Sequence, residues 1–195
     1  MADEDVQHWL ARTGPRVLRN MGAAPGQVVL DLGCRHGRYA VVAAQVVGPN
    51  GHVYGVDRDP TALKDAKRLA RSCGVSNLKW IALDIREKAL PVDPGTIDVA
   101  LLFDVTHAVF FPMPEQRRDL FAEVHRVLSP DGRMLIYPTH VRQHGPPLAQ
   151  LHAEVQASGF VEASRRRRHL LHDDQPVRGW VIDYRPGGQT REGNL

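Results

Sequence analysis

The stretch VVLDLGCRHGRYA, residues 28–40, decides which fold this chain is expected to adopt. Hydrophobic residues lead into Asp31, and two glycines bracket a short turn before the next segment begins. A buried strand that passes through a glycine turn to a helix N-terminus is typical of nucleotide-type ligand loops, because free N–H groups there attract anionic groups. Arg35 and His36 occupy the middle of the turn, where such loops prefer small residues. The stretch predicts a ligand loop with two unusual side chains.

Segments of two kinds alternate downstream of this loop. Short runs rich in β-branched residues are typical of strands buried on both faces of a sheet, and they occupy residues 27–32, 52–56, 78–83, 99–103 and 134–137. Helical patterns lie between them, over residues 38–47, 60–73 and 115–128. Because such alternation requires crossover connections, it predicts an α/β fold with a doubly wound, mostly parallel sheet and helices on both faces.

The C-terminal third predicts the edge of this sheet. The sequence SPDG at residues 129–132 is expected to be a turn, and residues 147–158 a further helix. Two strands are expected at residues 164–171 and 179–184, with HDDQPV between them. This pair predicts an antiparallel hairpin that closes the sheet.

One domain accounts for nearly all of the chain. Residues 1–186 are expected to form it, and residues 187–195 a flexible tail. Residues 1–22 are expected to be helical, with Trp9 in a candidate lid over the ligand. Trp180, in the last strand, is expected in the core.

The composition fits a single domain without a membrane span. The chain has 195 residues of which 43% are hydrophobic, enough for one core, and no window approaches ~18 uninterrupted apolar residues. The N-terminus lacks the basic start and apolar stretch of a signal peptide. Only Cys34 and Cys73 are cysteines, so a reducing, cytoplasmic setting is expected. No carboxylate or cysteine joins His140, His144 and His152, so no metal site is expected.

The densest charge is a run of arginines in a chain of net charge +3, and it consists of Arg165, Arg166, Arg167 and Arg168. Guanidinium groups bind phosphates bidentately, so an RNA surface is one interpretation. Aromatic residues make up only 6% of the chain, and a nucleic-acid binder usually spreads basic and aromatic side chains over a whole face. A solvated strand end is the favoured interpretation, and nucleic acid is not expected as a partner.

Two further acids end predicted strands. Asp57 follows the second strand, where a carboxylate can accept both hydroxyls of a ribose, and Asp84 closes IALDI at the third. Acids at three successive strand ends, facing one crevice, favour an adenosyl ligand. The loop pattern is D-x-G-x-x-x-G rather than G-x-G-x-x-G, which makes a nicotinamide enzyme a weaker alternative.

Five stretches carry a resemblance to a known family, namely VVLDLGCRHG, VYGVDRDP, IALDI, IDVALLFDVTHAV and EVHRVLSPDGRMLI. In this order they resemble class I S-adenosylmethionine-dependent methyltransferases over residues 25–138, and most of all the small "type 11" enzymes. The resemblance implies a seven-stranded Rossmann-like sheet and S-adenosylmethionine as cofactor, with S-adenosylhomocysteine as product. It also implies a small-molecule acceptor such as a metabolite or quinone.

The resemblance also implies which residues hold the cofactor. The residues of the first loop would surround its methionine part, Asp57 would hold the ribose, and Phe103 would lie near the sulfonium. Arg58, Asp84 and Ile85 would lie beside the adenine. The full set is Asp31, Gly33, Cys34, Arg35, Gly37, Asp57, Arg58, Asp84, Ile85 and Phe103.

The segment FDVTHAVFF, after the fourth strand, supplies the candidate catalytic residues Asp104 and His107. Methyl transfer depends mainly on alignment, although hydroxyl and phenol acceptors also need a base. His107 has a pKa range suited to proton abstraction, and the alternative that it only lines the pocket stays open. Asp104 is expected to position the sulfonium or the acceptor.

Two other functions stay open beside the enzyme. Arg35 in the loop is compatible with a non-catalytic pseudo-methyltransferase that only binds ligands, and the arginine run with an RNA or ribosomal-protein methyltransferase. Two cysteines are too few for arsenite methylation as similar enzymes perform it. The acceptor, the methylated element and the choice between monomer and homodimer are not determined by the sequence.

Overall fold

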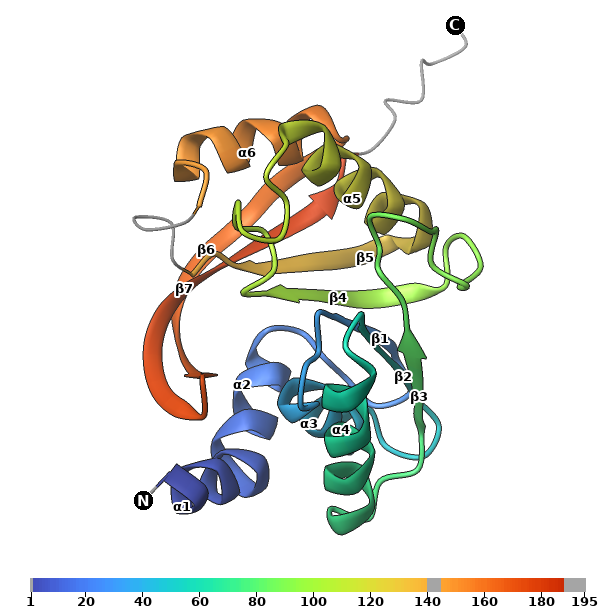
Figure 1. Ribbon diagram of the computed structural model, residues 1–195, viewed down its shortest axis with the longest axis vertical. Coiled ribbons are helices and arrows are strands. Elements are labelled where there is room, and N and C mark those ends of the chain that lie inside the picture. Colours follow the sequence, from blue (N-terminus) through green and yellow to red (C-terminus); the bar gives the residue numbers. More distant parts are fainter. Residues whose placement is uncertain (1, 140–144, 188–195) are drawn as a thin grey trace, which may run out of the picture.

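A computed structural model describes residues 2–139 and 145–187 of the chain. Its seven strands form one sheet in the order β3-β2-β1-β4-β5-β7-β6 (Figure 1). The strands are β1 (Val28–Leu32), β2 (His52–Asp57), β3 (Leu78–Ala82), β4 (Ile97–Phe103), β5 (Leu128–Tyr137), β6 (Phe160–His172) and β7 (Gln175–Pro186). The helical elements are α1 (Ala2–His8), η1 (Trp9–Thr13), α2 (Gly14–Asn20), α3 (Arg38–Val47), α4 (Pro60–Ser72), α5 (Pro114–Val127) and α6 (Leu148–Ala157).

The first five strands are parallel, and β7 pairs antiparallel with both β5 and β6. Strand order reverses between β1 and β4, which are neighbours although β2 and β3 separate them in the sequence. In open α/β sheets, ligands bind beyond the carboxyl ends of the strands at such a switch point. The predicted α/β, doubly wound sheet with its C-terminal hairpin is confirmed.

Helices cover both faces of the sheet (Figure 1). One buried cluster joins the sheet to α3, α2 and η1, and its centre is the fully buried Val41 and Val42 of α3. The other cluster joins the opposite face to α5 and α6, with Phe121 and Val155 fully buried. Asp59 caps α4 by accepting from Thr61 N–H at 2.8 Å, as an aspartate before a helix with Pro at its first position predicts. None of the helices in the described ranges is long and apolar enough to cross a membrane.

Two local expectations were wrong. Residues 129–132, expected to be a turn, belong to β5, and the register jumps there because Ile97 pairs with Leu128 while Val99 pairs with Arg133. The extra residues form a bulge within the strand rather than a connection outside it. Trp180, expected in the core, is 47% exposed, because its cross-strand partner is Arg167, whose guanidinium lies 5.4 Å from the indole ring.

The C-terminal hairpin is longer than expected. Both strands continue to a two-residue turn, Asp173-Asp174, whose φ angles of 47° and 59° are those of the tight type I′ turn. The six-residue connection expected at HDDQPV is therefore mostly strand. The hairpin curves away from the rest of the sheet (Figure 1), and its tip contacts Arg35 in the loop before α3 and Arg38 at the start of α3.

The N-terminal segment packs into the core. Trp9 is 3% exposed and its ring meets that of Tyr39 edge-on, with centroids 5.3 Å apart. The segment thus packs against the Tyr39 ring. Its role as a lid stays a prediction. Of the expected tail, residues 188–195 lie outside the described residues.

Candidate active site

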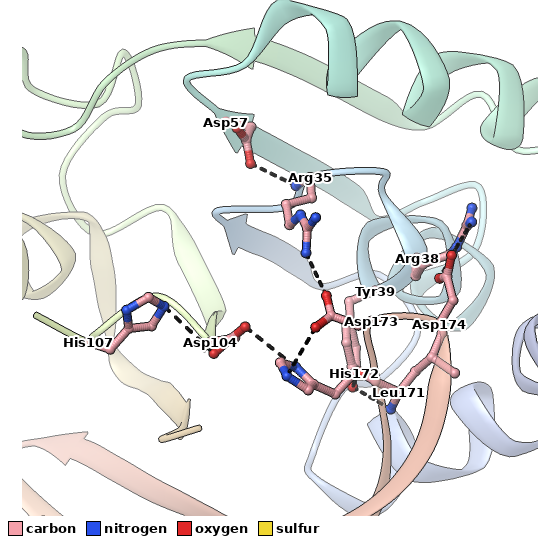
Figure 2. A network of polar contacts seen from close by, with 10 residues as sticks. All are labelled: Arg35, Arg38, Tyr39, Asp57, Asp104, His107, Leu171, His172, Asp173 and Asp174. Carbon is pink, nitrogen blue, oxygen red and sulfur yellow. Dashed lines mark hydrogen bonds and ion pairs between the residues drawn. The ribbon is translucent and has the colours of Figure 1, made fainter. Parts of the chain in front are cut away.

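The loop after β1 is fixed to the end of β2 by main-chain hydrogen bonds. Gly33 N–H and Cys34 N–H both donate to Val56 O, at 2.8 and 3.0 Å. Arg35 N–H donates to Asp57 Oδ2 at 2.7 Å (Figure 2), and Asp59 N–H donates to the other Asp57 oxygen at 2.9 Å. Each Asp57 oxygen keeps a lone pair, so the carboxylate can hold the loop and still accept a ligand hydroxyl.

The backbone conformation of this loop requires a glycine at Gly33 and is unusual for Arg35. Gly33 has a φ of +76°, and a Cβ there would lie 2.4 Å from Val105 Cγ2. Arg35 has a φ of 43°, a left-handed conformation that costs a residue with a Cβ about 1 kcal/mol. The structure therefore places a strained, non-glycine residue at the centre of the loop.

A cavity of about 290 Å³ opens beside the loop at the carboxyl ends of β1, β2 and β4. Seven of the ten predicted cofactor residues line it, namely Gly33, Arg35, Asp57, Arg58, Asp84, Ile85 and Phe103. Its walls also include Arg86, Phe110 and Phe111. The predicted residues are thus brought together by four separate stretches of the chain.

Two arginine side chains make electrostatic contacts at one end of this cavity. Arg86 Nε donates to Asp84 Oδ1 at 2.9 Å, and this hydrogen bond holds the pKa of Asp84 below its usual range. The Arg58 guanidinium lies 5.4 Å from the centroid of the Phe110 ring. Asp84 therefore stays ionised beside a flat, partly aromatic wall, which suits an adenine ring and its amino group.

Asp31 lies beneath the loop and is 3% exposed. Burial raises its pKa to about 7, although the N–H of Ala40 donates to its carboxyl group. Within the described residues its Oδ2 has no hydrogen-bond partner. Asp31 is not itself among the residues that line the cavity, but it directly precedes Leu32 and Gly33, which are. A buried acceptor of this kind suits the ammonium group of a ligand.

A second cavity, of about 270 Å³, adjoins the first. The two share the wall residues Gly33, Arg35, His36, Phe103 and Asp104. Its other side is formed by aromatic side chains and by the hairpin tip, namely Tyr39, Tyr137, Leu171, His172, Asp173 and Asp174. Cys34, predicted as a cofactor residue, and Arg38 also line it.

The hairpin tip is tied to the loop and to α3 (Figure 2). Arg35 Nη1 lies 2.8 Å from Asp173 Oδ1, and Arg38 makes two contacts with the Asp174 carboxylate, at 3.0 and 3.1 Å. These acids were not among the predicted site residues, because HDDQPV was expected to connect the two strands of a hairpin at the sheet edge. Two consecutive aspartates between two predicted strands were the available signal for a tight turn.

The predicted catalytic residues occupy different positions relative to the cavities. Asp104 has a left-handed φ of 59°, donates its N–H to Tyr137 O and lines both cavities. His107 is 8% exposed, lies with Nε2 3.9 Å from Asp104 Oδ1, and is not among the residues that line either cavity. His172, which the sequence analysis missed, contacts the other oxygen of Asp104 at 3.4 Å (Figure 2).

The comparisons with known proteins bear on this geometry. A family model described as a methyltransferase domain matches residues 23–173, most of the chain. The chain belongs to the class I S-adenosylmethionine-dependent methyltransferases.

Two curated relatives illustrate how far this chain resembles whole enzymes. It is 36% identical, over 58% of its length, to an arsenite methyltransferase of Halobacterium salinarum. It is 30% identical, over 70% of its length, to a 2-phytyl-1,4-naphtoquinone methyltransferase of Nostoc sp.. The chain spans 27% of the first relative and 59% of the second.

Solved structures share the fold of this chain. A SAM-dependent methyltransferase from Methanosarcina mazei has a TM-score of 0.69 at 17% identity, with 88% of this chain and 97% of that chain covered. An arsenic (III) S-adenosylmethionine methyltransferase from Chlamydomonas reinhardtii has a TM-score of 0.62 at 23% identity, covering 96% and 74%.

The cofactor of this family fits the residues that line and underlie the first cavity. Asp57 and Asp84 offer acceptors for a ribose and an adenine amino group, and the unsatisfied Asp31 Oδ2 matches the methionine ammonium. Gly33 approaches Val105 so closely that a Cβ would lie 2.4 Å from Val105 Cγ2, so a glycine is required at this wall of the cavity. This set of hydrogen-bond acceptors suits an adenosyl amino acid better than a bare nucleotide phosphate.

Strand alternation divides the run Arg165–Arg168 between the two faces of β6. Arg165 contacts Glu162 at 2.8 Å and Arg167 stacks on Trp180, whereas Arg166 and Arg168 line a separate cavity on the other face. The run is therefore not one continuous basic surface. Of the histidines considered for a metal, His140 and His144 lie outside the described residues, and His152 Nδ1 lies 3.0 Å from the Tyr184 hydroxyl.

Proposed function

We propose that this protein transfers the methyl group of S-adenosylmethionine to a small-molecule acceptor that binds in the second cavity. The observation that carries this proposal is the shared wall of the two cavities, which includes Gly33, Phe103 and Asp104. The first cavity offers hydrogen-bond acceptors for an adenosyl group, and the second offers aromatic rings and carboxylates. A donor and an acceptor bound on either side would meet at the switch point of the sheet.

Chain residues would align the two ligands. Asp57 would hold the ribose hydroxyls, and Arg58 and Ile85 would flank the adenine. Asp31 would bind the methionine ammonium under the loop. When bound, S-adenosylmethionine supplies an activated methyl group on a sulfonium, so the protein contributes mainly distance, angle and exclusion of water.

The second cavity favours a compact acceptor with an aromatic or planar body. Tyr39, Phe103 and Tyr137 present their rings to it, and neighbouring ring centroids lie 4.8 Å apart for Tyr39 and Phe103 and 6.2 Å for Phe103 and Tyr137. One matched relative is named for a naphthoquinone acceptor, which agrees with such a body. Arsenite is not proposed, because Cys34 is buried, burial raises the pKa of its thiol, and Cys73 is the only other cysteine.

The alternatives are separable by experiment. A pseudo-methyltransferase would bind S-adenosylmethionine and transfer no methyl group to any acceptor. An RNA methyltransferase would bind RNA with steep salt dependence that is lost when Arg166 and Arg168 are replaced by serine. A cytoplasmic location and a monomeric or homodimeric state are predictions from the sequence.

The direct test is transfer of labelled methyl groups from S-adenosylmethionine to a panel of small phenols, quinols, amines and thiols. The proposal expects turnover on one compact acceptor class, and loss of that turnover in Asp57→Asn. Turnover on RNA alone would contradict the small-molecule acceptor.

A further inference from the structure

The hairpin tip places one histidine in the second cavity. His172 is the last residue of β6, its side chain is 19% exposed, and it lines the cavity together with Tyr39 and Tyr137. Its Nδ1 lies 3.4 Å from Asp104 Oδ2 and its Nε2 lies 3.5 Å from Asp173 Oδ2 (Figure 2). His172 thus lies between Asp104 and the exposed Asp173, in the wall of this cavity.

The position of His172 is held on both sides along the chain. Before it, the Tyr39 hydroxyl donates to Leu171 O and accepts from Leu171 N–H, each at 2.9 Å. After it, the two-residue turn ends in Asp174, which makes the two-point contact with Arg38. These anchors come from α3, so the histidine is fixed relative to the cofactor loop rather than free at the end of a long hairpin.

Asp104 is equally fixed, and it presents one oxygen to each of two histidines. Its main chain is held by the hydrogen bond to Tyr137 O, in a left-handed conformation that aspartate tolerates. His107 lies on the Oδ1 side and outside the cavity linings, and His172 lies on the Oδ2 side and within the second cavity. Of the two histidines, His172 is therefore the one that a bound acceptor can reach.

We propose that His172 accepts the proton of an aromatic hydroxyl in the second cavity, and that Asp104 positions it for this step. The inference rests on the proposed methyltransferase function and specifies its acceptor as a phenol or quinol. Asp104 contacts Nδ1, which leaves Nε2 on the side where Asp173 closes the cavity. Asp173 is 62% exposed and its Oδ1 is paired with Arg35, so an acceptor hydroxyl can take its place beside Nε2.

The step balances without any further reagent. The acceptor O–H bond breaks and its proton goes to the lone pair on His172 Nε2. The oxygen electron pair forms the new O–CH₃ bond, while the C–S bond breaks and its pair stays on sulfur as a neutral thioether. The imidazolium then releases the proton to solvent through the exposed side of the hairpin tip.

Several charged or titratable groups face His172 and belong in any interpretation of its pH dependence. They are Asp104 and, behind it, His107 after β4, Asp173 in the turn, Arg35 in the loop, Tyr39 on α3 and Tyr137 on β5. Burial raises the pKa of both Tyr39 and Tyr137, so these phenols stay neutral near pH 7 and do not compete as bases.

The test compares His172→Gln with His169→Gln, an exposed histidine of the same strand outside both cavities. Methyl transfer is measured to phenols of graded acidity. For weakly acidic phenols we expect His172→Gln to lower kcat at least about 100-fold, with the KM for S-adenosylmethionine unchanged. For 4-nitrophenol, which ionises unaided near neutral pH, we expect a loss of less than about 10-fold. His169→Gln should match the parent chain with every phenol.

An equal loss with all phenols, or no loss, would overturn the role of His172. The readout without turnover is the ¹⁵N spectrum of the His172 imidazole in the cofactor-free protein. Addition of a phenol should shift this signal and leave His169 unchanged, and an unshifted His172 signal would overturn the placement of the acceptor. Turnover with amines but no phenol would overturn the acceptor class alone. Failure to bind S-adenosylhomocysteine would instead overturn the proposed function.

Discussion

Arg35 and Asp57 are joined by a hydrogen bond of 2.7 Å between the main-chain N–H of one and the carboxylate of the other. The residue that departs from the glycine pattern of the loop is therefore bound, through its main chain, to the acid proposed to hold the ribose. Its guanidinium points the other way, to Asp173 on the hairpin tip. Arg35 thus contributes to the walls of both cavities.

Arg35→Gly should stabilise the loop relative to Arg35→Ala. Both variants remove the exposed ion pair with Asp173, which contributes little to stability, but only glycine adopts a φ of 43° without strain. We expect the free energy of unfolding of the glycine variant to exceed that of the alanine variant by about 1 kcal/mol. Urea unfolding measures this difference, and equal values would mean that the left-handed φ carries no strain.

Asp57→Asn should weaken cofactor binding more than loss of charge alone explains. An amide has one acceptor oxygen, so it can satisfy only one of the N–H groups of Arg35 and Asp59 that Asp57 now accepts. We expect the Kd for S-adenosylhomocysteine to rise about 10- to 100-fold, as for the loss of charge-assisted hydrogen bonds. The control is Glu115→Gln on the exposed start of α5, whose Kd should equal that of the parent chain.

The pH dependence of stability should carry the signature of Asp31. Its pKa is raised from 3.8 to about 7 by burial, so the folded chain holds a proton that the unfolded chain releases above pH 4. The free energy of unfolding should therefore fall as pH rises from about 4 to about 7, by up to about 1.4 kcal/mol per pH unit.

Asp31→Asn should lose this slope, because an amide does not titrate. Urea unfolding at several pH values between 4.5 and 7.5 gives the slope for both chains. The same slope in Asp31→Asn and in the parent chain would mean that another group holds the proton.

Gly33→Ala should be more damaging than a small side chain suggests. Its Cβ would lie 2.4 Å from Val105 Cγ2, at a φ of +76°. We expect a loss of about 2 kcal/mol or more in the free energy of unfolding, from strain and overpacking together. Val105→Ala removes the clashing methyl group, so the double variant should be more stable than the sum of the single losses predicts. If the losses in the free energy of unfolding of the two single variants simply add, the destabilisation by Gly33→Ala comes from the left-handed backbone and not from the contact with Val105.

Much of the cofactor side was predictable because it is local in sequence. The acids that end β1, β2 and β3 follow directly from short apolar runs, and parallel strands bring their carboxyl ends to one edge. The same local patterns predicted α3 and α4. These local motifs were therefore enough to predict seven residues that line the first cavity.

The hairpin-tip residues of the second cavity were not predictable, because they reach it through contacts between segments far apart in the sequence. His172 reaches Asp104 because β6 and β7 extend to a two-residue turn and then curve over α3, and neither the extension nor the curvature has a periodic signal. The exposure of Trp180 has the same origin, since the hairpin leaves the covered part of the sheet and pairs this residue with Arg167. Contacts between residues far apart in sequence depend on such tertiary geometry.

If the proposed function is right, the first cavity binds S-adenosylmethionine through Asp57, next to an acceptor site. This binding is measured by calorimetric titration of S-adenosylhomocysteine into the parent chain and into Asp57→Asn. We expect one saturable site per chain in the parent, and binding weakened about 10- to 100-fold in the variant. Absence of binding to the parent chain, or equal affinity in both, would rule out this role of the cavity and of Asp57.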